Sequence, residues 1–200
     1  MTHQDSRPEA PATLAQPLSE IATTWQLDPA HSSVEFGVRH LMISTVKGRF
    51  GDISGTVTLD PNNESAAAVD ITVQTASIDT RQEQRDAHLR SPDFFDVQNW
   101  PVITFHGTSV EGDTDSEFQL TGDLTIRNVT REITLDVTKE GQGSDPWGNV
   151  RAAFSAKGKI DRRDFGLTYN QVLEAGGVVV GDEIKITVDV EFTAVPDVTA

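Results

Sequence analysis

Apolar and polar side chains alternate with a period of two over much of residues 33–192, and this pattern limits what the chain can fold into. Successive side chains of a β-strand point to opposite faces, so the period predicts strands that are buried on one face. Eight such runs are separated by turn-forming residues, at 34–38, 50–59, 69–73, 103–107, 118–126, 129–137, 152–160 and 184–192. Eight short alternating strands are typical of an all-β antiparallel barrel or sandwich.

Two interruptions of the alternation carry local predictions. The second run changes phase at Gly51-Asp52, which predicts a β-bulge at that point. Residues 40–43 break the pattern after the first run, and we interpret them as a helical turn.

One insert between the strands, residues 77–105, has helical features instead. Thr80 and Glu83 match the capping-box pattern, in which two side chains accept hydrogen bonds from N–H groups that the first helical turn leaves free. We expect this helix to end near Leu89 or Arg90, and Ser91-Pro92 predicts a second helix start.

The insert also carries a candidate binding feature. Arg81, Arg85 and His88 are spaced to share one face of the predicted helix. An aromatic cluster that includes Phe94 follows directly. A cationic stripe beside an aromatic cluster suits the mouth of a barrel, so these three residues are candidates for contacting a ligand head group. The alternative, that they pair with nearby Asp or Glu, stays open.

The charge of the chain argues against several classes of partner. A formal net charge of −15 disfavours nucleic acid, because little offsets repulsion by phosphates, and it disfavours flat binding to an anionic membrane. No apolar run reaches the ~18 residues of a membrane-spanning helix, so we expect no stable membrane insertion. The chain has no cysteine and therefore no disulfide framework.

The ends of the chain differ from its middle. Residues 1–23, rich in Pro and Ala, are predicted to form a disordered arm, with residues 24–195 as one barrel domain and 196–200 as a tail. A helical turn near residues 14–21 would be interrupted by Pro17. The first twenty residues contain no apolar segment of the signal-peptide type, so we expect a cytoplasmic location.

Small residues on the apolar faces favour a cavity inside the predicted barrel. Eight strands enclose an interior that side chains either just fill or leave open for one ligand. The small positions are Gly55, Gly107, Gly122, Ala152, Ala156 and Gly158, although the glycines could instead mark bulges or corners. The candidate residues for lining a cavity are Phe36, Val38, Met42, Phe50, Leu89, Phe94, Phe105, Leu124, Phe154, Ala156 and Phe165.

Together these residues resemble one family, the YceI-like polyisoprenoid-binding proteins. The matching motifs follow the family order at residues 25–28, 31–32, 36–42, 48–50, 77–80, 85–89, 94–96, 101, 121–126, 161–166 and 180–183. Each motif alone is weak, but the ordered set covers about residues 25–193 and is specific. At Asn128 the family usually has Gly, and Asn tolerates a left-handed turn.

The resemblance implies an eight-stranded lipocalin-like barrel with a helical insert that holds a long isoprenoid chain in an apolar tunnel. It also implies that the chain can form a homodimer. Many family members carry a secretory signal and work in the periplasm, and the N-terminus of this chain departs from them. No cofactor is implied beyond a bound isoprenoid or prenylated quinone.

Binding is favoured over chemistry for this chain. His31, His40, His88 and His106 show no spacing typical of a metal site, and the acidic motif residues are explained by structural pairing. The leading hypothesis is non-catalytic binding, transport or sequestration of a long isoprenoid or similar amphipathic lipid. The alternatives are a stress-response or interaction module with a filled barrel, and a hydrolase that would depend on His31, His88 or Asp86.

Overall fold

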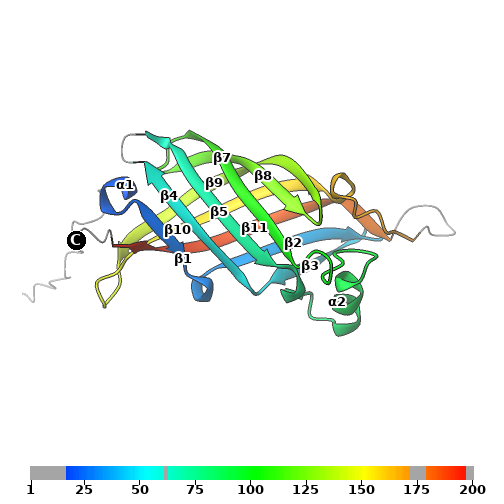
Figure 1. Cartoon of the computed structure of the whole chain (residues 1–200). Coiled ribbons are helices and arrows are strands. Elements are labelled where there is room, and N and C mark those ends of the chain that lie inside the picture. Colours follow the sequence, from blue (N-terminus) through cyan, green and yellow to red (C-terminus); the bar gives the residue numbers. More distant parts are fainter. Residues whose placement is uncertain (1–16, 61–62, 172–178, 197–200) are drawn as a thin grey trace, which may run out of the picture.

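The computed structural model describes residues 17–60, 63–171 and 179–196, and Figure 1 shows its arrangement. The described part of the chain forms one antiparallel sheet. Its strands are β1 (Thr24–Leu27), β2 (Ser33–His40), β3 (Ser44–Phe50), β4 (Ile53–Asp60), β5 (Asn63–Gln74), β6 (Ile78–Asp79), β7 (Val102–Gly112), β8 (Glu117–Ile126), β9 (Val129–Ser144), β10 (Val150–Asp161) and β11 (Val180–Val195). The helices are α1 (Leu18–Ile21), α2 (Glu83–Arg90) and the 3₁₀ turns η1 (Pro29–His31), η2 (Thr75–Ser77) and η3 (Arg162–Phe165).

The sheet closes on itself because β1 pairs with both β4 and β11. The closed ring runs β1-β4-β5-β7-β8-β9-β10-β11, so the predicted eight-stranded antiparallel barrel is confirmed. The N-terminal part of β11 pairs with β2 instead, and β3 and β6 continue the sheet from there. β6 follows β5 in the chain, with η2 between them. The strands β2, β3 and β6 therefore complete the barrel wall between β11 and β5 toward the other end of the barrel.

Two local predictions about the early strands were wrong. Gly51-Asp52 is not a bulge but the junction between β3 and β4, and Phe50 pairs with Val34 in the β2–β3 hairpin. Residues 40–43 are not helical, because they form the tight turn of this hairpin. Leu41 and Met42 adopt left-handed φ angles of 51° and 59°, and the Ile43 N–H donates to the His40 carbonyl at 3.1 Å.

The β8–β9 turn also differs from expectation. Arg127, and not Asn128, takes the left-handed conformation, with φ of 57°. The tolerance of Asn for that conformation is therefore not what this turn uses.

Residues 17–23, which the prediction assigned to the N-terminal arm, are described together with the barrel. Pro17 precedes α1, and both Ser19 and Ala22 are buried against the barrel. Residues 1–16 and 197–200 lie outside the described residues, so the prediction for them is not addressed. In Figure 1, α1 lies at one end of the barrel, whereas α2 and the end of β2 lie at the other.

Among the described residues, no helix is both long enough and apolar enough to cross a lipid bilayer.

Candidate ligand-binding cavity

The interior of the barrel contains a cavity of about 330 Å³. This volume lies in the range of roughly 300–1,000 Å³ that is usual for small-molecule sites. The wall is almost entirely apolar, because each strand of the ring turns one alternating face inward. Its polar or charged members among the described residues are Ser19, Glu35, Thr114, Asp115 and Arg162.

Most of the predicted lining residues lie on this wall. They are Phe36, Val38, Phe50, Leu89, Phe94, Phe105, Leu124, Phe154 and Ala156. Whether they contact a ligand stays a prediction, since the positions alone establish only that they border the cavity.

Two predicted lining residues lie elsewhere. Met42 is 58% exposed at the tip of the β2–β3 hairpin, where a tight turn carries it off the barrel wall. Phe165 is buried in η3 and packs into the core next to the cavity without bordering it. Neither position follows the strand period, so alternation could not orient either side chain.

The small residues divide into two groups. Ala152 and Ala156 border the cavity as expected. The glycines do not leave open space, because bulky neighbours lie over them: a Cβ on Gly122 would be 2.5 Å from the Phe105 ring, and one on Gly158 would be 2.5 Å from Leu135. The expectation that these glycines keep a tunnel open was therefore wrong.

Several wall residues were missed by the sequence reasoning. Trp25 is buried beside the cavity, and its indole N–H donates to the Ala22 carbonyl at 3.1 Å. The inward residues of β11 could have been found from the same period-two signal. The larger set of missed apolar wall residues includes Leu18, Leu27, Phe118, Ile184, Ile186, Val188, Val190 and Phe192.

The insert beside the cavity is capped differently from the prediction. The side chain of Gln82, not Thr80, accepts the hydrogen bond from the backbone N–H of Arg85 at the start of α2. Thr80 is buried, and its N–H and hydroxyl both donate to Oδ1 of Asp86, at 2.9 and 2.5 Å. The Thr80 hydroxyl is thus used inside the insert and cannot cap the helix.

Ser91 ends α2 instead of starting a second helix. Its hydroxyl donates to the His88 carbonyl at 2.7 Å, and turns follow in the next residues.

The predicted cationic stripe does not form. Arg81 precedes α2 with a left-handed φ of 62°, and Arg85 donates to the hydroxyl and carbonyl oxygens of Thr80 at 2.7 and 2.8 Å. His88 lies 2.9 Å from a carboxylate oxygen of Asp93, so it has the acidic partner that the alternative interpretation required.

None of the three head-group candidates borders the cavity. The ring of His88 does contact Phe94, a wall residue, with 5.1 Å between ring centroids.

A separate cluster of hydrogen-bonded charged residues connects neighbouring segments on the outside of the barrel. The Arg151 guanidinium donates to Asp28 at 2.7 Å, to Glu191 at 2.5 Å and to Asp145 at 3.0 Å. The hydrogen bond from Arg151, together with one from His31, lowers the pKa of Asp28 to about 2. Hydrogen bonds from Asn149 and then Arg151 likewise lower the pKa of Asp145 to about 2.

Asp28, His31 and Glu191 each have one atom that could bind a metal ion, and these three atoms lie within 4.8 Å of one another. The Arg151 guanidinium already bonds both carboxylates of this group, so the cluster is explained as an ion-pair network that joins η1, β10 and β11.

A closed eight-stranded antiparallel barrel around an apolar cavity places the chain in the class of lipocalin-like barrels. Residues 25–192 match the model of the YceI-like domain, and the chain belongs to this family, as the sequence motifs indicated.

Relatives and solved structures agree with the assignment. The chain is 44% identical over 151 residues to the protein YceI of Escherichia coli O157:H7, which covers 74% of this chain and 78% of the relative. The crystal structure of the Campylobacter jejuni YceI protein matches with a TM-score of 0.66 and 34% identity, over 79% of this chain and 90% of that one. A Saccharophagus degradans polyisoprenoid-binding domain shares the fold, with a TM-score of 0.64 at 15% identity over 87% of this chain and 99% of that one.

Proposed function

We propose that the barrel binds the apolar chain of a long isoprenoid, or of a similar amphipathic lipid such as a prenylated quinone, and carries or sequesters it unchanged. The observation that carries this proposal is the cavity of about 330 Å³ with an apolar wall inside a closed barrel. The structural similarity to a domain described as polyisoprenoid-binding supports the same class of ligand.

The physical chemistry of the wall fits such a ligand. Each methylene group that leaves water for an apolar site contributes ~0.8 kcal/mol, so a five-carbon prenyl unit contributes roughly 3 kcal/mol before costs. Several units offset the entropy lost when a flexible chain is ordered. A filled barrel without a ligand is the less favoured alternative, because the interior space remains between the packed side chains.

The hydrolase alternative finds little support in the contacts of its candidate residues. The Asp86 carboxylate accepts two hydrogen bonds from Thr80, and His31 and His88 each pair with a neighbouring aspartate. Structural roles therefore account for all three side chains, and we propose that the protein acts without catalysis.

Organic extraction of the protein purified from its own host, followed by mass spectrometry, tests the proposal most directly. We expect a co-purifying lipid with an isoprenoid chain. Binding of geranylgeraniol, measured by displacement of an environment-sensitive apolar dye, provides the independent arm. No lipid in repeated extractions, together with no saturable dye site, would contradict the proposal.

Two further expectations stay predictions. Light scattering after gel filtration tests the homodimer, and cell fractionation against marker enzymes tests the cytoplasmic location.

A further inference from the structure

Three of the five lysines of this acidic chain lie on neighbouring strands of the barrel. Lys159 on β10 lies directly opposite Lys185 on β11, and Gly37 on β2 lies opposite both Lys185 and Lys47 on β3. Neighbouring strands are about 4.8 Å apart, so Lys159, Lys185 and Lys47 form a row across four strands. We call these three exposed residues the lysine row.

The lysine row is not explained by stability. Like charges directly opposite each other on adjacent strands destabilise a sheet. In a chain with a net charge of −15, an acidic residue in place of one of these lysines would remove the repulsion. Lys159 lies 3.3 Å from Glu183, whereas no carboxylate of the described residues lies within ion-pair distance of Lys185 or Lys47.

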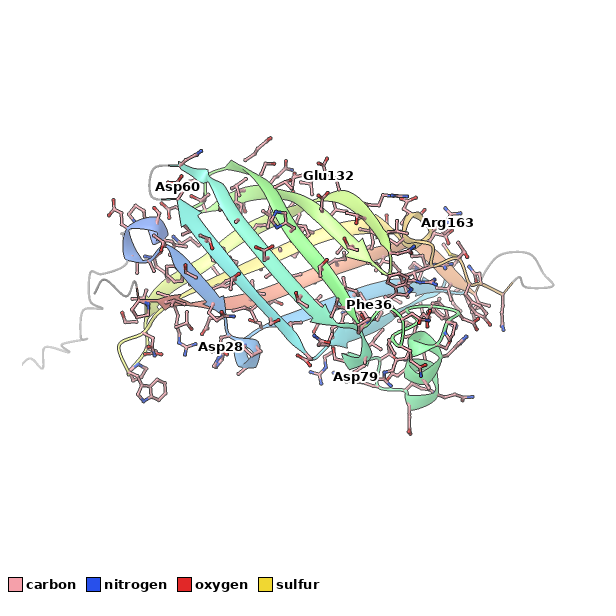
Figure 2. The ribbon with its side chains drawn as sticks, viewed as in Figure 1. Asp28, Phe36, Asp60, Asp79, Glu132 and Arg163 are labelled. Atoms are coloured by element: carbon pink, nitrogen blue, oxygen red, sulfur yellow. The ribbon has the colours of Figure 1, made fainter. Side chains whose placement is uncertain are left out.

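Two of the nearby acidic residues already have cationic partners. Asp161 and Asp182 pair with Arg163, and Asp182 also pairs with the buried Arg162. Arg163 lies at the end of the barrel opposite Asp60 (Figure 2).

An exposed apolar tip adjoins the row. In the β2–β3 hairpin, Met42 is 58% exposed and Ile43 is 79% exposed. The Arg39 guanidinium donates to the Met42 carbonyl at 2.5 Å and so stabilises the tip. It also adds a positive charge beside the two apolar side chains.

The backbone of the tip is unfavourable for its residues. Leu41 and Met42 occupy left-handed conformations that hairpins normally fill with Asn and Gly. Large apolar side chains at these positions are costly to folding, so their presence indicates a role outside the fold.

We propose that the hairpin tip and the lysine row together dock the protein on the anionic surface of a lipid bilayer. Met42 and Ile43 would enter the head-group layer, while Arg39, Lys47 and Lys185 face the lipid phosphates, as in other interfacial anchors. Charges on the rest of the barrel oppose this only weakly, because at 0.1 M salt they are screened beyond about 10 Å.

The docking surface is continuous with one end of the cavity. Val180 borders the cavity and pairs with His40, the last residue of β2 before the tip. Docking would therefore bring that end of the apolar interior to the bilayer. This inference goes beyond the proposed function, and it holds or fails without any ligand in the barrel.

Flotation of the full chain with vesicles tests the proposal. The two vesicle types are phosphatidylcholine alone and phosphatidylcholine mixed with phosphatidylglycerol. We expect the protein to float with the mixed vesicles at about 0.1 M salt, where the charges on the rest of the barrel are screened, and to float less as salt is raised further.

Four variants separate the contributions, and each is checked for an unchanged circular dichroism spectrum. Met42→Ser with Ile43→Ser removes the tip, and Trp147→Ser is its control, because Trp147 is 82% exposed in the β9–β10 loop at the α1 end of the barrel (Figure 1). Lys185→Glu reverses one charge of the row, and Arg131→Glu makes the same change of net charge on β9, outside the row.

The tip variant should bind mixed vesicles several-fold more weakly, because it loses the two apolar side chains that enter the head-group layer. Lys185→Glu should also bind several-fold more weakly, since one interfacial cation is worth roughly fivefold in affinity. The two control variants should bind like the wild type. The proposal is overturned if the wild type does not prefer anionic vesicles, or if each variant matches its control. It is also overturned if Lys185→Glu weakens binding but the tip variant does not, because that pattern describes a surface for an acidic soluble partner.

Discussion

A methyl group added at Gly122 would lie 2.5 Å from the ring of Phe105 and 2.5 Å from the His106 carbonyl oxygen. The backbone oxygen cannot move away easily, so Gly122→Ala should force a shift of the strand and destabilise the protein by about 1–3 kcal/mol. Urea denaturation measures this loss.

Gly51→Ala is the matched control, because a Cβ at Gly51 would meet no atom within 4 Å. It should be neutral or stabilising by up to about 1 kcal/mol, through the lower entropy of the unfolded chain. Equal losses in the two variants would contradict the explanation that the His106 carbonyl oxygen and the Phe105 ring leave no room for a side chain at Gly122.

A substitution at Ala156 distinguishes an open cavity from a fully packed core. Ala156→Phe places a ring on the cavity wall, so we expect loss of geranylgeraniol binding with the melting temperature kept or raised. A fully packed core would instead lose about 1–3 kcal/mol of stability.

Ala153→Phe serves as the control, since Ala153 lies on the same strand but on the opposite face. This variant should keep geranylgeraniol binding. Dye displacement and thermal melts of the two variants provide the measurement, and retained binding in Ala156→Phe would contradict an open site at that position.

At the scale of an element, the conformation of the insert at the start of α2 depends on the buried carboxylate of Asp86. Asp86→Ala would leave the buried Thr80 N–H and hydroxyl without their acceptor, which should cost about 1–3 kcal/mol. Asp86→Asn keeps an oxygen in place and should cost less. Urea denaturation and amide hydrogen exchange in α2 measure the difference, and equal losses would argue against the acceptor role.

The strands show how far sequence reasoning reaches. Long strands such as β8 and β11 have enough residues to display the period of two, and they were predicted. β1 and β6 have four and two residues, which is too short for a periodic signal. The alternation of β3 is hidden by Gly48, the residue opposite Phe36 on β2.

The site was predictable to the same extent and for the same reason. Wall residues on long strands, such as Phe105 and Phe154, follow from alternation. Side chains in turns do not, so Met42 and Phe165 were misplaced. Gln82 caps α2, because the Thr80 hydroxyl bonds to Asp86, six residues later, and the capping-box pattern does not contain that contact.

At the scale of the whole molecule, the Arg151 cluster should make stability depend on pH. Asp28 has its pKa lowered from 3.8 to about 2, so its contribution is full above about pH 4 and is lost as the pH falls through about 2. In Arg151→Met this pKa should return toward its ordinary value. The difference in unfolding midpoint between wild type and variant should therefore be largest above pH 4 and shrink toward pH 2.

Denaturation series over this pH range test the prediction. Arg131→Met is the control, because among the residues that the structure describes Arg131 donates only to a backbone carbonyl, so the variant should show no such trend. A constant difference for Arg151→Met over the whole range would mean that the lost interaction is not electrostatic.

The closing strand has a consequence for how the protein is made. Of the described strands β11 comes last in the sequence, yet it pairs with β10, β1 and β2, and Val195 lies opposite Thr24. During translation the first strands therefore emerge long before their partner exists, with open edges and exposed apolar faces. Contacts so distant in sequence form slowly, and such intermediates are prone to aggregate. We therefore expect the barrel to close only after β11 has left the ribosome.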